Sequence, residues 1–243
     1  MLEMMERHRL GYESAGIAAV QDNKIAFIKN VGPVNVVFPA EGFWSRILYG
    51  QVGIGHTRYP TKTAPVGKSK FAHPFLSCDG KVALIHNGVI YDYQEVWNEL
   101  RHHEFSSFDE ELNKINDIEV VVHLFEEKIV AASGDIVKAV SQTCERLSRE
   151  PRNTYLFAFL FLPHASKIFL VSGRGDGRRV VVANKREFGS IFASYRDDGI
   201  DEQEPLKFEA IKPYINLHQD KFEVIQFNTL TILTNDDYNS IPI

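Results

Sequence analysis

The chain has 243 residues, of which 44% are hydrophobic and 24% charged, and its formal net charge is −5. This composition is typical of a globular protein and the length favours one large core, so we expect residues 1–243 to form a single domain. The mildly acidic charge argues against a nucleic-acid partner, and the longest apolar run, about Tyr155–Leu162, is too short to cross a membrane.

The first third of the chain is predicted to contain one helix followed by paired strands. The opening residues MLEMMERHRL have helical spacing, but no capping residue precedes them. Charged residues interrupt this stretch, so it does not resemble a signal peptide. Turn-forming pairs separate the short apolar runs that follow, as expected for strands. The predicted strands are Ser14–Val20, Ile25–Ile28, Val34–Phe38, Val52–His56 and Val82–His86.

The middle of the chain is predicted to be helical because its apolar residues recur every three or four positions. Asn116, with Glu119 three residues later, predicts a capping box at the start of the helix Asp117–Ala131. Cys144 lies on the apolar face of the helix Asp135–Arg149, so we expect Cys144 to be a core residue. The predicted helices are Tyr91–His103, Asp117–Ala131 and Asp135–Arg149.

From Thr154 onward the chain is predicted to consist of strands. Six short apolar runs separated by turns carry this pattern: TYLFAFLFL, KIFLVSG, RRVVVAN, GSIFASY, FEVIQF and TLTILT. The GRGDG stretch, Gly173–Gly177, lacks the Lys-Ser/Thr of a phosphate-binding loop and is predicted to be a turn. Strands, then the two long helices Asp117–Ala131 and Asp135–Arg149, then more strands indicate an α+β domain with two sheets and helices packed outside them.

Three polar motifs, GHTRYPT, AHPF and HNG, interrupt this pattern at strand ends, where binding sites tend to lie. Taken singly, Arg58 would suit a surface ion pair, Asn87-Gly88 a turn, and Asp117 the dipole of its helix.

The histidines of the three motifs raise the question of a metal centre. His56, His73 and His86 match no standard ligand spacing, so we expect no metal site.

The chain holds only two cysteines, which implies no disulfide framework and favours a reducing cytoplasm.

In their order along the chain, the motifs resemble those of the class II glutamine amidotransferase domain. The matching stretches are GYESAGIA, GHTRYPT, AHPF, HNG with a Tyr-rich helix after it, and the helix start NDIEVV. The resemblance covers about Gly11 to Leu124. It implies a four-layer αββα sandwich of two stacked antiparallel sheets, the N-terminal nucleophile hydrolase fold.

The resemblance also implies a site for glutamine. Release of ammonia from the side-chain amide passes through a tetrahedral oxyanion, which needs hydrogen-bond donors placed where charge develops. The Asn87 side chain and the Gly88 backbone N–H would supply these donors. Arg58 would bind the α-carboxylate of glutamine, and Asp117 would bind its α-ammonium group. Two further substrate-binding residues are implied, Thr61 and His73.

The same resemblance indicates a missing nucleophile. The family uses an N-terminal Cys on a first strand ahead of the opening helix, whereas this chain begins inside that helix. Neither Cys78, predicted in a turn, nor Cys144 is placed to substitute for it. We therefore expect that strand to be missing, leaving a central gap or an exposed sheet edge near the HNG strand, and the chain to be inactive as given. Leu10 and Lys62 also depart from the family pattern.

The leading hypothesis is a glutaminase domain or subunit that passes ammonia from L-glutamine to a separate synthase subunit, with glutamate synthase as one candidate. RYPT and AHPF favour the glutamate synthase and amidophosphoribosyltransferase branches, while GHT favours the hexosephosphate branch. The chain start would then lie too far downstream, and an in-frame Cys-Gly upstream of Met1 would support this.

The alternative is a catalytically inactive amino-acid-binding or regulatory homologue, which the replacement at Leu10 favours. A peptide-cleaving relative on the same fold is a third class, disfavoured by HNG and by the pair Arg58 and Asp117. No cofactor, nucleic acid or membrane partner is expected. The protein is expected to be cytoplasmic and to form a homo-oligomer through an exposed sheet edge.

Overall fold

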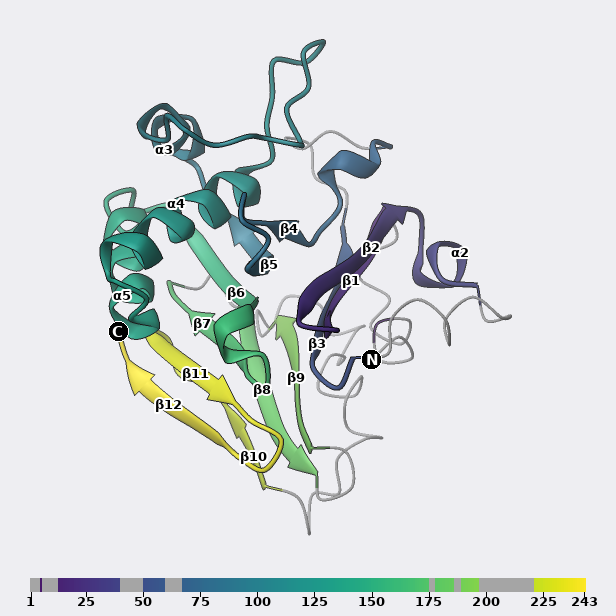
Figure 1. Ribbon diagram of the computed structural model, residues 1–243, viewed down its shortest axis with the longest axis vertical. Coiled ribbons are helices and arrows are strands. Elements are labelled where there is room, and N and C mark those ends of the chain that lie inside the picture. Colours follow the sequence, from purple (N-terminus) through teal and green to yellow (C-terminus); the bar gives the residue numbers. More distant parts are fainter. Residues whose placement is uncertain are drawn as a thin grey trace.

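The computed structural model describes Met5 and residues 13–39, 50–59, 67–174, 178–185, 189–196 and 221–243 (Figure 1). Its helices are α2 Val34–Val37, α3 Tyr93–Glu99, α4 Asp117–Ala131 and α5 Ile136–Leu147. Its strands are β1 Ser14–Gln21, β2 Lys24–Val31, β3 Gly53–Arg58, β4 Phe75–Leu76, β5 Val82–Val89, β6 Thr154–Phe161, β7 Ile168–Ser172, β8 Arg178–Lys185, β9 Gly189–Arg196, β10 Lys221–Val224, β11 Thr229–Leu233 and β12 Tyr238–Pro242.

The main sheet is antiparallel and has six strands in the order β12-β11-β7-β6-β5-β4. Its central strand β6 is buried along almost its whole length because both faces of the sheet are covered. Alternate side chains of a strand point to opposite faces. One face of β6 therefore contributes Tyr155, Phe157, Phe159 and Phe161 to one core, and the other contributes Leu156, Ala158 and Leu160 to a second core.

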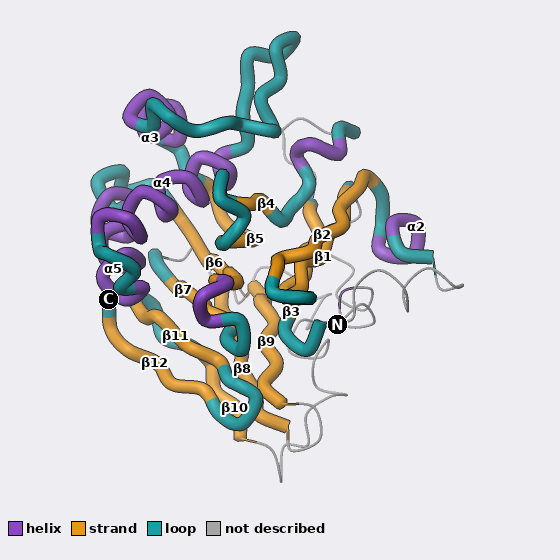
Figure 2. The backbone as a smooth tube through the Cα atoms, viewed as in Figure 1, coloured by secondary structure: helices purple, strands orange, loops and turns teal. Residues whose placement is uncertain are grey.

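Helices α4 and α5 cover the aromatic face of this sheet (Figure 1, Figure 2). Helix α4 contacts α3 and α5 as well as β5, which explains why Ile118–Phe125 are all buried. Helix α5 buries only one stripe, which includes Ala139, Val140 and Leu147. The Asp135 side chain caps α5 by accepting a hydrogen bond from the backbone N–H of Lys138.

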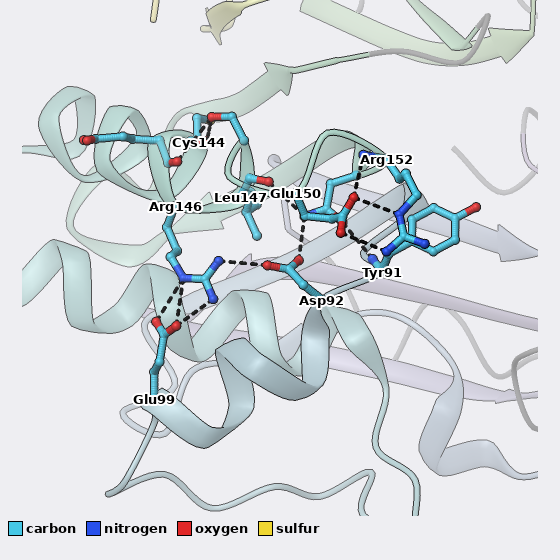
Figure 3. Close-up of polar contacts among 11 residues, drawn as sticks. Tyr91, Asp92, Glu99, Cys144, Arg146, Leu147, Glu150 and Arg152 are labelled. Carbon is cyan, nitrogen blue, oxygen red and sulfur yellow. Dashed lines mark hydrogen bonds and ion pairs between the residues drawn. The ribbon is translucent and has the colours of Figure 1, made fainter.

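A buried ion-pair network fixes α5 to the segment that follows β5 (Figure 3). Arg146 donates to Asp92 at 2.8 Å and to Glu99 at 2.6 Å, so one guanidinium joins both ends of α3 to α5. Asn153 donates to the same Asp92 carboxylate at 2.7 Å and accepts from the backbone N–H of Tyr91 at 2.7 Å. The chain leaving the HNG strand is therefore held in one position.

The second β layer consists of two three-stranded sheets, β2-β1-β3 and β10-β8-β9. Both pack on the same face of the main sheet, and Ala18 and Ile54 from one and Val180 and Val182 from the other share a core with Leu160. Figure 1 shows both small sheets on the side of the main sheet away from α4 and α5.

A fourth layer covers the outer face of β1 and β2. Val34 and Phe38 pack there with Met5, the only described residue of the predicted opening helix, against Ala15 and Ile17 of β1. Four layers thus follow one another, and the predicted α+β sandwich of the αββα type is confirmed.

Several predicted elements need correction. Val34–Phe38 was expected to be a strand, but Val34–Val37 is a short helix that starts after Pro33, because the β1–β2 hairpin is complete without it. The predicted helix Tyr91–His103 ends at Glu99. The HNG motif lies inside β5 rather than after it, and the strands β4 and β12 were not predicted.

Of the two alternatives expected, a central gap or an exposed sheet edge near the HNG strand, the exposed edge at the HNG strand is not found. Strand β5 is flanked by β4 and β6, so it is an interior strand. Among the strands that the structure describes, the division falls in the second layer, where β3 and β9 end separate sheets. An oligomer formed through a free β5 edge is therefore not supported.

In the part of the chain that the structure describes, no helix has both the length and the apolar character needed to cross a membrane.

Candidate functional site

Arg58, the last residue of β3, is buried and forms an ion pair with Glu13. Its Nη1 lies 3.0 Å from a Glu13 carboxylate oxygen. Register between β1 and β3 places Ser14 opposite Arg58, and the Ser14 hydroxyl donates to the same carboxylate at 2.8 Å. The backbone N–H of Gly67 donates to the other oxygen of Glu13 at 3.1 Å. Glu13 therefore orients the guanidinium.

His73 connects the two sheet layers. Its ring stacks on His56 of β3 at 4.4 Å between centroids, and its Nδ1 accepts from the backbone N–H of His86 in β5 at 3.3 Å. Burial, reinforced by charges that include those of Arg58 and Lys29, holds the pKa of His73 well below its usual 6.5. A neutral imidazole is what an Nδ1 acceptor requires.

Gly16 of β1 explains why the His73 backbone can come so close to the small sheet. A Cβ at Gly16 would lie 1.9 Å from the carbonyl oxygen of His73. Gly16, the second glycine of the GYESAGIA motif, therefore makes room for the backbone of the AHPF motif.

Asn87 and Gly88 lie next to His86 in β5. The Asn87 amide donates to the Ser194 hydroxyl of β9 at 3.4 Å, so it reaches toward the second layer. Gly88 has φ +154°, and a Cβ there would lie 2.1 Å from the carbonyl oxygen of Thr154. Only glycine fits between β5 and β6 at this position.

Asp117 is the first residue of α4 and is half-buried. Its carboxylate accepts from the backbone N–H of Ile90 at 3.1 Å, which ties α4 to the end of the HNG strand. Burial raises the pKa of Asp117, and the positive charge of Arg58 opposes that rise. The two predicted substrate-binding charges therefore lie on different elements, Arg58 at the end of β3 and Asp117 at the start of α4.

The capping box predicted at α4 forms only in part. Asn116 accepts from the backbone N–H of Ile118 at 2.9 Å, as predicted. Glu119 instead accepts four hydrogen bonds, from the backbone N–H and hydroxyl of both Ser106 and Ser107. The Asn116 backbone N–H donates to the Ser107 hydroxyl. A carboxylate as buried as Glu119 needs several hydrogen-bond donors. The loop before α4 supplies four donors, whereas a capping box would supply only the backbone N–H of Asn116.

The sequence analysis missed three residues of this region: Glu13, Lys29 and Ser194. Lys29 donates to the carbonyl oxygen of Pro74 at 2.9 Å and lies over the Phe75 ring, and burial lowers its pKa to about 8. An acidic residue at the start of a buried strand was the signal for Glu13. Thr61 lies outside the described residues.

Comparison with known proteins agrees with the motifs. Residues 39–135 match a family model described as a glutamine amidotransferase domain. The glutamine–fructose-6-phosphate aminotransferase of Pyrococcus horikoshii is 33% identical over 200 residues, which are 78% of this chain and 31% of that protein. The corresponding protein of Aeropyrum pernix is 33% identical over 229 residues, 83% of this chain and 35% of that protein.

The chain carries a class II glutamine amidotransferase domain. Its fold agrees with this assignment. A solved structure titled as the allosteric regulatory enzyme of purine biosynthesis aligns over 99% of this chain and 46% of its own, with a TM-score of 0.65 and 19% identity. The fold is the predicted N-terminal nucleophile hydrolase type.

This amidotransferase chain spans about a third of the length of the curated relatives that it matches.

Both of its cysteines lie in elements other than those that carry the site. Cys78 follows β4 in an exposed turn, and Cys144 lies in α5, where burial raises its pKa to about 12.

Proposed function

We propose that this chain binds L-glutamine and L-glutamate and is the ammonia-releasing part of an amidotransferase. The match of residues 39–135 to a glutamine amidotransferase domain, with Arg58 and Asp117 both in motifs inside that stretch, supports this most strongly. One cation at the end of β3 and one anion at the start of α4 suit the two ends of a zwitterionic amino acid. Each charge-assisted hydrogen bond to such a ligand stabilises the complex by about 1.5–3 kcal/mol.

Under this proposal, Asn87 and Gly88 stabilise the oxyanion formed when the side-chain amide is attacked. Their place on β5 supports this, because the Ile90–Asp117 bond links the end of the same strand to the proposed ammonium-binding residue. Arg58 binds the α-carboxylate, and Thr61 and His73 complete the substrate-binding set.

The proposed partner is a synthase domain or subunit that accepts the ammonia. The matched relatives are named for fructose 6-phosphate as acceptor, and glutamate synthase stays a candidate on the RYPT and AHPF motifs. We propose that the 243-residue chain by itself has no glutaminase activity, because neither cysteine is placed as nucleophile. An amino-acid-binding or regulatory role is the alternative.

Calorimetric titration of the chain with L-glutamine and L-glutamate tests the binding site. We expect Arg58→Lys to weaken binding by about tenfold, because a point charge cannot make a two-pronged contact with a carboxylate. Asp117→Asn should weaken binding at least as much, since it removes the partner of the ammonium group.

Two matched variants control for the general effect of each change. Arg152→Lys alters an exposed arginine paired with Glu150, and Asp135→Asn alters the cap of α5, where asparagine is an equally good capping residue. Both should bind like the wild type. The proposal is contradicted by a folded wild-type chain that binds neither amino acid, or by equal affinity in all five proteins.

A further inference from the structure

A second cluster of chemically reactive side chains lies on α4, away from the helix end that carries Asp117. Cys78 belongs to the turn after β4, His103 to the loop after α3, and His123 and Glu126 to the middle of α4. Figure 1 shows α4 running beside β4 and beneath the loop that leaves α3. The four side chains come from three separate segments of the chain.

The potential ligand atoms of this cluster converge. The Cys78 Sγ lies 3.5 Å from Nδ1 of His103 and 3.6 Å from Nδ1 of His123. A Glu126 carboxylate oxygen lies 3.3 Å from Nδ1 of His103 and 3.2 Å from Nδ1 of His123. All four ligand atoms lie within 4.8 Å of one another.

Four of the six separations between these atoms are those of a tetrahedral zinc site. Zinc binds sulfur at about 2.3 Å and nitrogen or oxygen at about 2.0–2.2 Å, so the ligand atoms of a regular tetrahedron are roughly 3.3–3.6 Å apart. The four distances measured here span 3.2–3.6 Å. One thiol, two imidazoles and one carboxylate are also ligand types that zinc accepts.

Neighbouring groups hold the ligands in place. The Glu126 carboxylate accepts from the backbone N–H groups of Cys78 at 3.0 Å and Asp79 at 3.1 Å, which fixes the turn over α4. Nε2 of His103 lies 3.4 Å from a Glu127 carboxylate oxygen. A carboxylate on the far nitrogen of a histidine ligand is the usual support in zinc sites, because it sets the tautomer and orients the ring.

Burial of the cluster is also that of a structural metal site. The side chains of His103, His123 and Glu126 are 9%, 2% and 14% exposed, whereas Cys78 is exposed and gives an ion access from solvent. Such an ion would be largely shielded from competing water.

We propose that Cys78, His103, His123 and Glu126 bind one Zn²⁺ ion. The ion cross-links the turn after β4, the loop after α3 and the middle of α4, and thereby stabilises the helix whose first residue is Asp117. Binding converts the Cys78 thiol to a thiolate and releases its proton to solvent. The role is structural and independent of amide hydrolysis.

Metal titration of the purified chain tests this directly. Metal-free protein, kept reduced, is titrated with Co²⁺ and followed by absorption, and Zn²⁺ affinity is then measured by competition with a chromophoric chelator. We expect one ion per chain, a thiolate-to-cobalt charge-transfer band, and the intense visible bands of tetrahedral Co²⁺. Zn²⁺ should displace the cobalt and raise the melting temperature.

Variants assign the ligands. We expect Cys78→Ser and His123→Gln each to weaken zinc binding more than about 100-fold, since loss of a supporting group alone costs about 10–100-fold. Cys78→Ser should also abolish the charge-transfer band, and Glu127→Gln should weaken binding about tenfold. Cys144→Ala and His102→Gln, a thiol and an exposed histidine outside the cluster, should bind zinc within about twofold of the wild type.

Two results would overturn the proposal. One is a folded wild-type chain, verified by circular dichroism, that binds less than one zinc ion at micromolar concentration. The other is a Cys78→Ser variant that keeps the wild-type affinity and cobalt spectrum. Because Cys78 lies in an exposed turn, its variant is expected to fold, so loss of binding would report on the ligand.

Discussion

Gly88 lies at the tightest point of the candidate site. A Cβ there would be 2.1 Å from a backbone carbonyl oxygen that the β5–β6 pairing holds in place, and φ is +154°. We therefore expect Gly88→Ala to destabilise the protein by about 3 kcal/mol or more. Urea denaturation measures the loss.

Gly134 provides the matched comparison for Gly88. It also has a positive φ, +85°, but nothing lies within 4 Å of a Cβ at that position. Gly134→Ala should therefore cost only the backbone strain, about 1 kcal/mol. Equal losses in the two variants would show that the close approach to Thr154 does not matter.

The pKa of Asp117 implies a pH-dependent stability. Burial raises this pKa above the ordinary 3.8, so the unfolded chain releases the proton at lower pH than the folded protein does. The stability contributed by Asp117 is present in full below pH 3.8 and is lost as the pH rises through the folded pKa. Asp117→Asn has no carboxyl group to ionise, and its side-chain oxygen can still accept from Ile90.

We therefore expect Asp117→Asn to gain stability relative to the wild type as the pH rises from about 4 to 7. Denaturant unfolding at both pH values measures this difference, with the exposed Asp135→Asn as a control for the removal of a carboxylate. A difference that stays constant, or that shrinks at neutral pH, would contradict the proposed cost of burying Asp117.

At the scale of elements, Arg146 is the main polar link between α5 and α3. Its removal breaks the ion pair of Asp92, a residue that is only 8% exposed. We expect Arg146→Met to cost about 3–5 kcal/mol, the usual loss when one member of a buried ion pair is removed. Chemical denaturation gives the value.

The exposed Arg149→Met, near the end of the same helix, should change stability by no more than about 0.5 kcal/mol. Adding Asp92→Asn to Arg146→Met should recover part of the loss, because the unpaired charge is then gone. If the double variant is no more stable than Arg146→Met, the cost arises from packing and not from the charge.

At the scale of the whole molecule, the positions of the two cysteines predict an inactive chain. Covalent amide hydrolysis needs an activated nucleophile beside the oxyanion site, and the Cys144 thiol stays protonated at neutral pH because its pKa is about 12. We expect ammonia release from L-glutamine to stay at background. Release at a rate typical of enzymes, and retained in Cys78→Ala, would contradict this.

Elements with a strong local signal were predicted well from the sequence. Asn116 and Asp135 mark the starts of two helices, and Asp117–Ala131 was predicted with its observed bounds. Val34–Phe38 was predicted wrongly because five apolar residues fit either a strand or a short helix. The strand β4 has only two residues, so it gives no periodic signal.

Local periodicity along the chain was enough to predict a layered α+β architecture, because it is encoded in neighbouring residues. The order of the motifs, through their resemblance to a known family, pointed to Arg58, Asn87, Gly88 and Asp117 as candidate site residues. Only the packed structure revealed that Glu13 orients Arg58 and that His73 is buried and neutral. It also decided that Cys78 meets His103 and His123, although the motif histidines had suggested no metal site. These contacts join separate segments of the chain, up to 45 residues apart for Glu13 with Arg58 and for Cys78 with His123, and only the packing of sheets and helices brings such segments together.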